Sequence, residues 1–283
     1  MLTVDWRLST PYPWTVFEEE PDRGPPTSLR GWLSDVYLPA LLDEDQKSLT
    51  ALALRLGSRA TVDDPIFGRA SGVPALDRYV EEVSAWLKTH KAKYTRLYFT
   101  TGIDRDVTEG TLALTFDDKT VDLPVAVVAE RRRSREVELR VYYSTQPIKG
   151  TFAARSPLVQ EDDEIALPDM VSAHIAALRK ADIATLVAGF EADGTLREAR
   201  GVEHAKTAGL EEFYKKLVAA GASNAGVEIL KGGAADDGRT CALEYTLVKI
   251  HGKDVPPQAA LAVYERGDSG LLRSLRIYDD LES

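Results

Sequence analysis

The chain has 283 residues, of which 44% are hydrophobic and 28% charged, and it carries a net charge of −10. These values are typical of a globular protein of about two domains, and the acidic balance argues against nucleic acid as a partner, because phosphate binding needs a concentrated positive surface. The single cysteine, Cys241, excludes an intrachain disulfide and a cysteine-based zinc site.

The N-terminus lacks a signal-peptide pattern, and no apolar run approaches the roughly 18 residues of a membrane span. We therefore expect a cytoplasmic protein without a membrane partner. Residues 1–33 are rich in proline and acidic residues and are predicted to form an irregular N-terminal arm. Its tryptophans, Trp6, Trp14 and Trp32, favour an arm that packs on a domain over a free tail.

Residues 34–146 are predicted to form a first domain in which helices precede strands. Apolar residues recur at helical spacing over 35–56, which indicates two helical segments with a bend, and again over 75–88, after Pro74. A short strand is expected at 60–64. Longer strands follow at 94–101, 110–116, 120–130 and 137–143, with polar turns between them.

Residues 147–167 change in character, with several prolines and an acidic run, and are predicted to be a linker. Residues 168–283 then repeat the order of elements. A helix is expected over 168–190, a short strand over 195–200 and a second helix over 209–219. Four strands complete the copy, at 226–231, 239–250, 259–265 and 271–278.

The two halves also share residues. Shifting the chain by 134 positions places Asp64 on Glu198, Val62 on Leu196 and Tyr79 on Phe213, and after two single-residue insertions Leu139 falls on Leu275. A chain that repeats itself once is read as two copies of one domain. Helices followed by a four-stranded meander indicate an α+β domain, with helices covering one face of a curved antiparallel sheet.

These features resemble the nuclear transport factor 2-like superfamily, also called SnoaL-like or ketosteroid isomerase-like. The resemblance lies in residues 60–65, in the helix entry at 72–79 and in residues 139–142, and it extends over both copies. It implies two tandem cone-shaped domains, each with a hydrophobic pocket. Because many members of the superfamily dimerise through their sheets, it also implies an internal pseudo-dimer within a monomeric chain.

The resemblance also implies a site. The ketosteroid isomerases carry a general-base aspartate before a proline on the first strand, as Asp64 stands before Pro65, and Glu198 takes the same place in the second copy. A carboxylate inside an apolar cone is desolvated, which suits it to proton transfer. The alternative is a structural carboxylate that caps loop amides or pairs with Arg69 or Arg200.

His174 shares an apolar helix face and falls where the isomerases carry an oxyanion-hole tyrosine, so it is the expected partner of Glu198. The alternative is a satisfied core histidine. The matching residue of the first copy is Ala40, for which Tyr37 is a possible substitute. Three further tyrosines on strands could line pockets: Tyr98, Tyr245 and Tyr264. The protonated acid of the isomerase oxyanion hole is absent from both copies, which argues against true ketosteroid isomerisation.

The four histidines show no metal-binding spacing, and no phosphate loop, dinucleotide fingerprint or nucleophile elbow is present, so neither a metal nor a cofactor is expected. The leading hypothesis is a cofactor-independent enzyme, isomerase-like or a cyclase-like lyase. It would act on a small, apolar, carbonyl-bearing metabolite by proton transfer, cyclisation or dehydration. The catalytic residues expected are Glu198 and His174, with Asp64 as a weaker base. The alternative is a non-catalytic binding or scaffold protein of the same fold.

Overall fold

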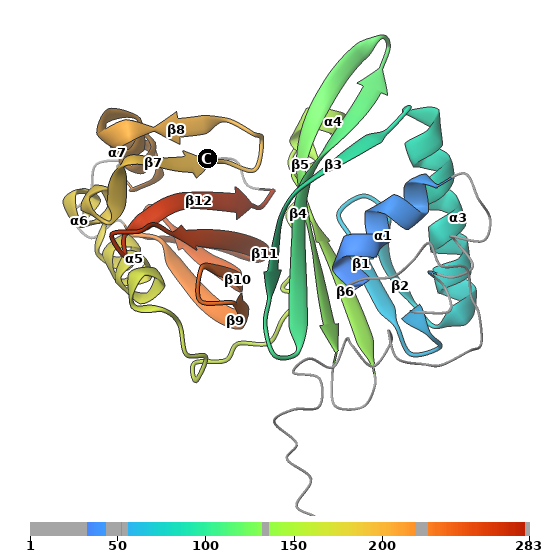
Figure 1. The fold of residues 1–283 in the computed structure, drawn as a ribbon, viewed down its shortest axis with the longest axis horizontal. Helices are drawn as coiled ribbons and strands as arrows, with labels where there is room; N and C mark the ends of the chain where they lie inside the picture. Colours follow the sequence, from blue (N-terminus) through green and yellow to red (C-terminus); the bar gives the residue numbers. More distant parts are fainter. Residues whose placement is uncertain (1–32, 44–51, 53–55, 132–135, 219–225, 281–283) are drawn as a thin grey trace, which may run out of the picture. The chain divides into compact units, whose positions relative to one another are not determined.

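The structure is a computed structural model, and it describes residues 33–43, 52, 56–131, 136–218 and 226–280. Within these residues the chain forms two compact units, each built on one six-stranded sheet (Figure 1). The predicted fold class, two tandem α+β domains, is confirmed. Residues 1–32 of the predicted N-terminal arm, and residues 44–51 and 53–55 of the predicted helical segments, lie outside the described part of the chain, and Leu33 is the first residue of helix α1.

The first unit carries two described helices and six strands: α1 (Leu33–Leu42), β1 (Thr61–Asp64), β2 (Gly68–Ser71), α3 (Val73–Thr89), β3 (Lys93–Thr101), β4 (Arg105–Phe116), β5 (Lys119–Arg131) and β6 (Val137–Tyr142). Helix α3 begins after Gly72, whose φ of 76° lies in the left-handed region that favours glycine, and has Pro74 in its first turn. Its buried face consists of Leu76, Tyr79, Val80, Val83 and Leu87, as its spacing predicts.

Helix α1 is fixed to the sheet and to α3 by polar contacts. The backbone N–H of Ser34 donates to Asp106 Oδ2 on β4 at 3.0 Å, and the Ser34 and Thr108 hydroxyls are 2.8 Å apart. The Ser84 hydroxyl of α3 donates to the carbonyl of Leu41 at 2.9 Å. Because these groups are buried or partly buried, each bond satisfies a polar atom that would otherwise be costly to desolvate.

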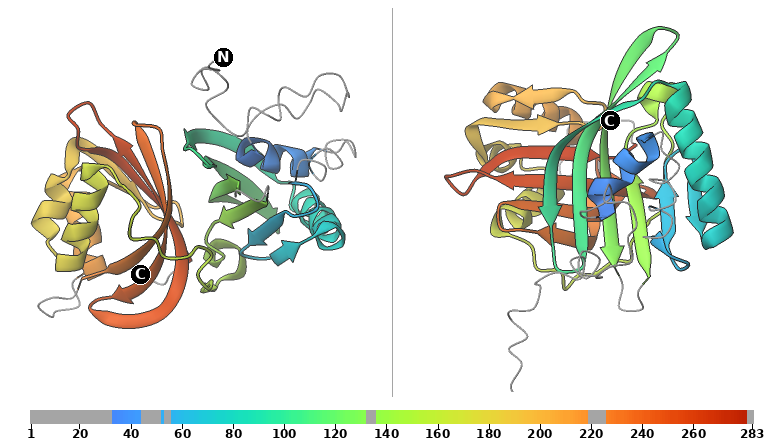
Figure 2. Two further views of the ribbon diagram at one scale, coloured as in Figure 1. Left: turned by 90° about the horizontal axis from the view of Figure 1, so that it is seen from below. Right: turned by 45° about the vertical axis from the view of Figure 1, so that its right-hand side comes forward.

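The second unit carries the remaining elements: α4 (Gln146–Lys149), α5 (Asp169–Lys180), α6 (Ile183–Ala188), β7 (Phe190–Arg197), β8 (Glu203–Ala205), α7 (Lys206–Val218), β9 (Glu228–Asp236), β10 (Thr240–Ile250), β11 (Lys253–Arg266) and β12 (Leu272–Tyr278). Figure 2 shows α5, α6 and α7, in yellow to orange, on one face of its sheet. The strands that we expected in the two units are present within a few residues of their predicted ends, except that β4, β7, β9 and β11 extend further.

The predicted single helix over 168–190 is wrong. Helix α5 ends at Lys180, Ala181 adopts a left-handed φ of 53°, and α6 begins after Asp182. The Asp182 carboxylate accepts a hydrogen bond from the Thr185 N–H at 3.1 Å, so Asp182 is an N-cap that starts a new helix. The apolar spacing runs through this break from Leu178 to Leu186, which is why periodicity alone did not locate it.

Two short strands were also missed, and the sheets are mixed rather than purely antiparallel. β2 pairs antiparallel with β1, and β8 with β7, whereas β1 runs parallel to β6 and β7 parallel to β12. The short strands have little β-branched or aromatic content, so composition gave no strand signal. They form hairpins that close immediately after Asp64 and around Glu198.

The two sheets share one strand order, β2-β1-β6-β5-β4-β3 and β8-β7-β12-β11-β10-β9. Their registers agree as well, since Val62 pairs with Leu139 and Leu196 pairs with Leu275. These are the residues that the comparison of the two halves places on each other. All four side chains are 0–1% exposed, and burying an aliphatic side chain of this size contributes roughly 1.5–3 kcal/mol.

The core of the second unit lies between its sheet and its helices. Along β10 the alternate residues Cys241, Leu243, Tyr245 and Leu247 join this core. Opposite Tyr245 on β11 stands Ala260, and Ala262 stands opposite Leu243. A register shift between Glu244 and Tyr245 marks a bulge against β9, and bulges bend a strand. Small side chains on a bent sheet leave space beneath it.

Part of the predicted linker, residues 147–167, lies along the edge of the second sheet. The Asp162 N–H donates to the carbonyl of Lys231 on edge strand β9 at 2.8 Å, and Lys231 Nζ donates to the carbonyl of Asp163 at 2.7 Å. Unpaired edge strands are sites of unwanted pairing between chains, so this segment protects β9. The boundaries of the predicted domains, and their arrangement as a pseudo-dimer, stay predictions.

Candidate functional site

A cavity of about 90 Å³ lies in the second unit, several times the roughly 10–15 Å³ that one water needs on the same measure. Both predicted catalytic residues of this copy, His174 and Glu198, line it, as do Tyr245 and Tyr264. Its other lining residues are mostly apolar: Ser144, Phe152, Leu178, Ala199, Arg200, Phe213, Tyr214, Leu217, Val227, Ile229, Leu247, Ile250, His251, Ala262, Leu275, Ile277 and Asp279. We call this space the second-unit cavity.

His174 projects from α5 and is held between two tyrosines. Its Nε2 is 2.8 Å from the Tyr214 hydroxyl of α7, and its Nδ1 is 3.4 Å from the Tyr264 hydroxyl of β11. Burial lowers the pKa of His174 to about 3. The imidazole is therefore neutral near pH 7, so one ring nitrogen donates a hydrogen bond and the other accepts one.

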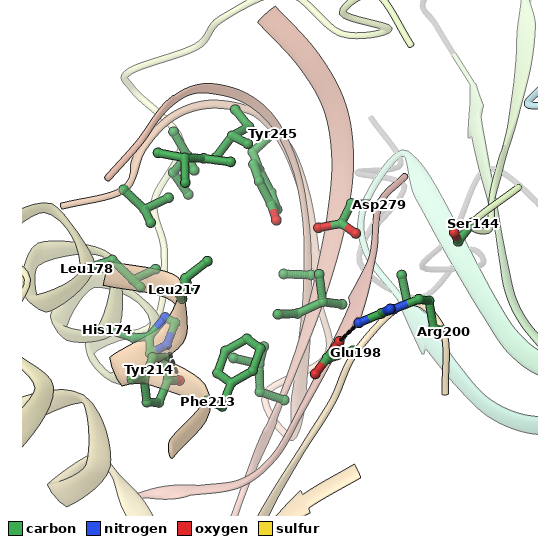
Figure 3. A pocket seen from close by; sticks show the side chains of 18 of the residues that line it. Ser144, His174, Leu178, Glu198, Arg200, Phe213, Tyr214, Leu217, Tyr245 and Asp279 are labelled. Carbon is green, nitrogen blue, oxygen red and sulfur yellow. Dashed lines mark hydrogen bonds and ion pairs between the residues drawn. The ribbon is translucent and has the colours of Figure 1, made fainter. Parts of the chain in front are cut away.

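Glu198 lies in the β7–β8 hairpin, one residue beyond the end of β7. Its backbone N–H donates to the Val202 carbonyl at 2.9 Å, which fixes the turn. Its Oε1 is 2.5 Å from His204 Nε2 on β8, and its Oε2 accepts from Arg200 at 3.1 Å. In Figure 3 the Glu198–Arg200 pair and His174 lie on different walls of the cavity. The structure thus brings the two predicted residues into one cavity, but gives each its own polar partners.

His204 is a residue whose role the sequence left open between the rim of a pocket and solvent. Its side chain is 14% exposed, and its ring lies against Phe213, 5.0 Å between centroids. The packed ring and the short contact to Glu198 make His204 a positioning residue for that carboxylate. The sequence did contain a signal for this contact, namely the short separation of Glu198 and His204. A tight hairpin brings residues a few positions apart onto neighbouring strands.

Asp279 was missed altogether. It lies one residue beyond β12 and lines the cavity together with Leu275 and Ile277. These three residues are two positions apart, so strand alternation from Leu275 would have placed Asp279 on the cavity side. Its negative charge contributes to raising the pKa of Tyr245, after burial itself.

Asp64, the counterpart of Glu198 in the first unit, is 6% exposed and caps a loop. Its Oδ1 accepts from the N–H groups of Ile66 at 2.8 Å and Phe67 at 3.0 Å, and its Oδ2 is 3.4 Å from the Tyr79 hydroxyl. The Tyr79 hydroxyl also bonds that of Tyr37. Tyr37, the possible substitute for His174, is therefore linked to Asp64 through Tyr79, a residue of the buried face of α3.

Tyr98 and Cys241 have no place in the candidate site. Tyr98 on β3 is 44% exposed and does not line the second-unit cavity. Cys241 is fully buried in the core, as its alternation predicts, and burial raises the pKa of its thiol to about 12, so it is no nucleophile at neutral pH.

Within the described ranges, no group of three or more histidine, cysteine, aspartate or glutamate residues is arranged to hold a metal ion. Nor does any helix of the described residues have the length and apolar character needed to cross a membrane.

No family model and no curated protein matches the chain. Solved structures that are similar to it include an NTF2-like protein of unknown function from Cytophaga hutchinsonii, with 18% identity over 42% of this chain and 94% of that chain and a TM-score of 0.32. Another is a hypothetical protein with a ketosteroid isomerase-like fold from Catenulispora acidiphila, in complex with trimethylamine, with 18% identity, 42% and 90% coverage and a TM-score of 0.34. A third is an LEH-like epoxide hydrolase of M. tuberculosis, with 22% identity, 40% and 81% coverage and a TM-score of 0.34.

These similar structures are of the NTF2-like and ketosteroid isomerase-like kind that the sequence resembles. Each is matched over most of its own length by about two fifths of the present chain. The tandem α+β architecture itself is shown by the two six-stranded sheets and their common strand order. The chemistry of the chain has to be argued from its own residues.

Proposed function

We propose that the second unit is a cofactor-independent catalyst of the SnoaL-like, ketosteroid isomerase-like type. It binds a small, largely apolar, carbonyl-bearing molecule in the second-unit cavity and moves protons on it. The observation that carries this proposal is that one mostly apolar cavity is lined by both His174 and Glu198. An apolar cavity with a few convergent polar groups is the usual form of a small-molecule site.

Glu198 is the base in this proposal. A carboxylate has about four lone-pair positions, so the bonds to His204 and Arg200 orient it and still leave room to accept a proton. Removal of a proton next to a carbonyl gives an enolate. Return of that proton to another carbon isomerises the ligand, whereas attack of the enolate on a second carbonyl closes a ring.

His174 supplies a polar, uncharged wall opposite the base. Because its pKa is lowered to about 3, it does not compete with the ligand for the proton that Glu198 removes. Its hydrogen bonds to Tyr214 and Tyr264 hold the ring in place. The neutral imidazole and its tyrosine partners thus present fixed dipoles on this wall, which can stabilise charge that develops on a bound ligand.

A second candidate function is binding without catalysis. It is favoured by one observation, namely that both oxygens of Glu198 and both nitrogens of His174 already have protein partners. In that case the polar groups stabilise the walls of a binding site and no proton moves. Catalysis and binding alone predict different results for hydrogen exchange on a bound ketone.

The test is deuterium exchange at the methylene carbon of 4-fluorophenylacetone, followed by proton NMR in D₂O with the full chain. We expect the wild type to accelerate exchange over buffer, and Glu198→Gln to lower the catalysed rate by about a hundredfold to ten thousandfold. Glu203→Gln is the matched control, because Glu203 is exposed and lies next to His204. Binding without faster exchange would support the second candidate, and equal rates in wild type and Glu198→Gln would contradict the assignment of Glu198.

A further inference from the structure

We infer that Tyr245 is the hydrogen-bond donor that binds the ligand oxygen in the second-unit cavity, and that the cavity selects neutral carbonyl compounds over carboxylates. This inference rests on the proposed function for the existence of a ligand, and it assigns the group that recognises it. Neither His174 nor Glu198 has this role.

The position of Tyr245 on β10 directs its side chain toward the cavity. Tyr245 shares the core face of β10 with Leu243 and Leu247, and Ala260 stands beside it on β11. An alanine at that position leaves space that a larger residue would fill. Figure 3 shows the ring reaching inward, with its hydroxyl pointing into the cavity on the side of Asp279.

The Tyr245 hydroxyl is available to donate a hydrogen bond to a ligand. Its side chain is only 8% exposed, yet among the described residues it forms no hydrogen bond. The other two tyrosine hydroxyls on the cavity, those of Tyr214 and Tyr264, are both engaged with His174. A hydroxyl that opens on the cavity and bonds none of the described residues can donate to a ligand oxygen placed beside it.

The charges that line the cavity favour a neutral carbonyl oxygen over a carboxylate beside Tyr245. Burial and the charge of Asp279 raise the pKa of Tyr245 well above its ordinary value, so the hydroxyl keeps its proton and donates. Asp279 and Glu198 both line the cavity, and they repel an anion that approaches Tyr245. Arg200 offsets part of this charge near Glu198, where the two side chains are paired. A neutral ketone, aldehyde or ester therefore fits the donor, whereas a carboxylate does not.

The experiment compares three probes of one shape in fluorine NMR titrations of the full chain. The probes are 4-fluorophenylacetone, the alkene in which a methylene replaces its carbonyl oxygen, and 4-fluorophenylacetate. We expect the wild type to bind the ketone about threefold to tenfold more tightly than the alkene, the range of one net hydrogen bond, and the carboxylate most weakly. In Tyr245→Phe the ketone and alkene should bind equally, with alkene affinity retained as proof that the cavity is intact.

Tyr98→Phe is the matched control, because it removes the hydroxyl of an exposed tyrosine in the first unit. If Tyr245→Phe keeps the preference for the ketone, or if the wild type shows none, the inference is wrong while small-molecule binding stands. If the carboxylate binds as well as the ketone, the proposed charge selection is wrong. Absence of binding by all three probes would overturn the inference and the proposed function together.

Discussion

Glu198 and His204 meet across the β7–β8 hairpin, where Glu198 Oε1 lies 2.5 Å from His204 Nε2. The pair forms because β8 returns antiparallel to β7, with His204 opposite Leu196. The hairpin thereby holds the carboxylate on the wall of the cavity. The same fold in the first unit holds Asp64 on loop amides instead, so equivalent positions have different partners in the two units.

The first prediction concerns this pair. His204→Ala removes the group that orients Glu198, and we expect the exchange rate of bound 4-fluorophenylacetone to fall about tenfold, less than in Glu198→Gln, because the base itself remains. His204→Gln, which can donate a hydrogen bond from a similar position, should recover part of the rate. A pH profile of exchange that is identical in wild type and His204→Ala would argue against this positioning role.

The second prediction concerns pH and His174. The folded protein keeps this imidazole neutral down to pH about 3, whereas the unfolded chain protonates it below pH about 6.5. The unfolded state therefore binds more protons in this window, and the second unit loses stability as pH falls from about 6.5 toward 3. The loss has an upper slope of about 1.4 kcal/mol per pH unit.

Urea unfolding of the full chain at several pH values, followed through the NMR signals of β10 amides, measures this loss. His174→Asn should flatten the dependence of the unfolding free energy on pH. His90→Asn is the control, because it replaces a partly exposed histidine of the first unit. Equal slopes in wild type and His174→Asn would show that the second unit does not keep His174 neutral.

The third prediction concerns the buried His174–Tyr214 bond. Tyr214→Phe leaves one nitrogen of the imidazole without its partner at 2.8 Å, in a fully buried position, and should cost about 1–3 kcal/mol of unfolding free energy. Tyr264→Phe should cost less, because its contact to His174 is longer, at 3.4 Å. The reverse order of the two variants in the same urea experiment would contradict the assigned geometry.

The fourth prediction concerns Asp64 as a cap. Asp64→Ala removes the acceptor of two loop amides and should destabilise the first unit by about 0.5–2 kcal/mol, the range of lost caps. Asp64→Asn keeps an acceptor oxygen and should cost less. Tryptophan fluorescence during urea unfolding reports on the first unit through Trp86. Equal losses for the two variants would indicate that the charge of Asp64, and not its loop bonds, stabilises the unit.

The two tandem α+β domains could be predicted from the sequence because they depend on the apolar spacing within each element and on the internal repeat. The repeat matches Val62 to Leu196 and Leu139 to Leu275, and the two sheets pair these residues in the same registers. Which strands pair, and that these pairs are parallel, was not predicted. The break at Ala181 escaped because a left-handed residue leaves the apolar spacing intact. Short strands such as β8 escaped because pairing with a neighbour, and not composition, makes them strands.

The site was predictable only in part. Alternation places Tyr245 and Tyr264 on the cavity, and the repeat finds Glu198, but the partners of His174 come from residues 40 and 90 positions away. No sequence pattern specifies such side-chain contacts. Asp279 could have been found, since it continues the alternation of Leu275 and Ile277, and its role in the charge of the cavity became evident only with Tyr245 beside it.

The most direct test of the central claim is a crystal structure of the full chain with bound 4-fluorophenylacetone. We predict that the ketone occupies the second-unit cavity, with its oxygen within hydrogen-bond distance of the Tyr245 hydroxyl and its methylene carbon facing the Glu198 carboxylate. A ketone bound elsewhere, or one whose methylene carbon faces away from Glu198, would contradict the assignment of this cavity as the site of proton transfer.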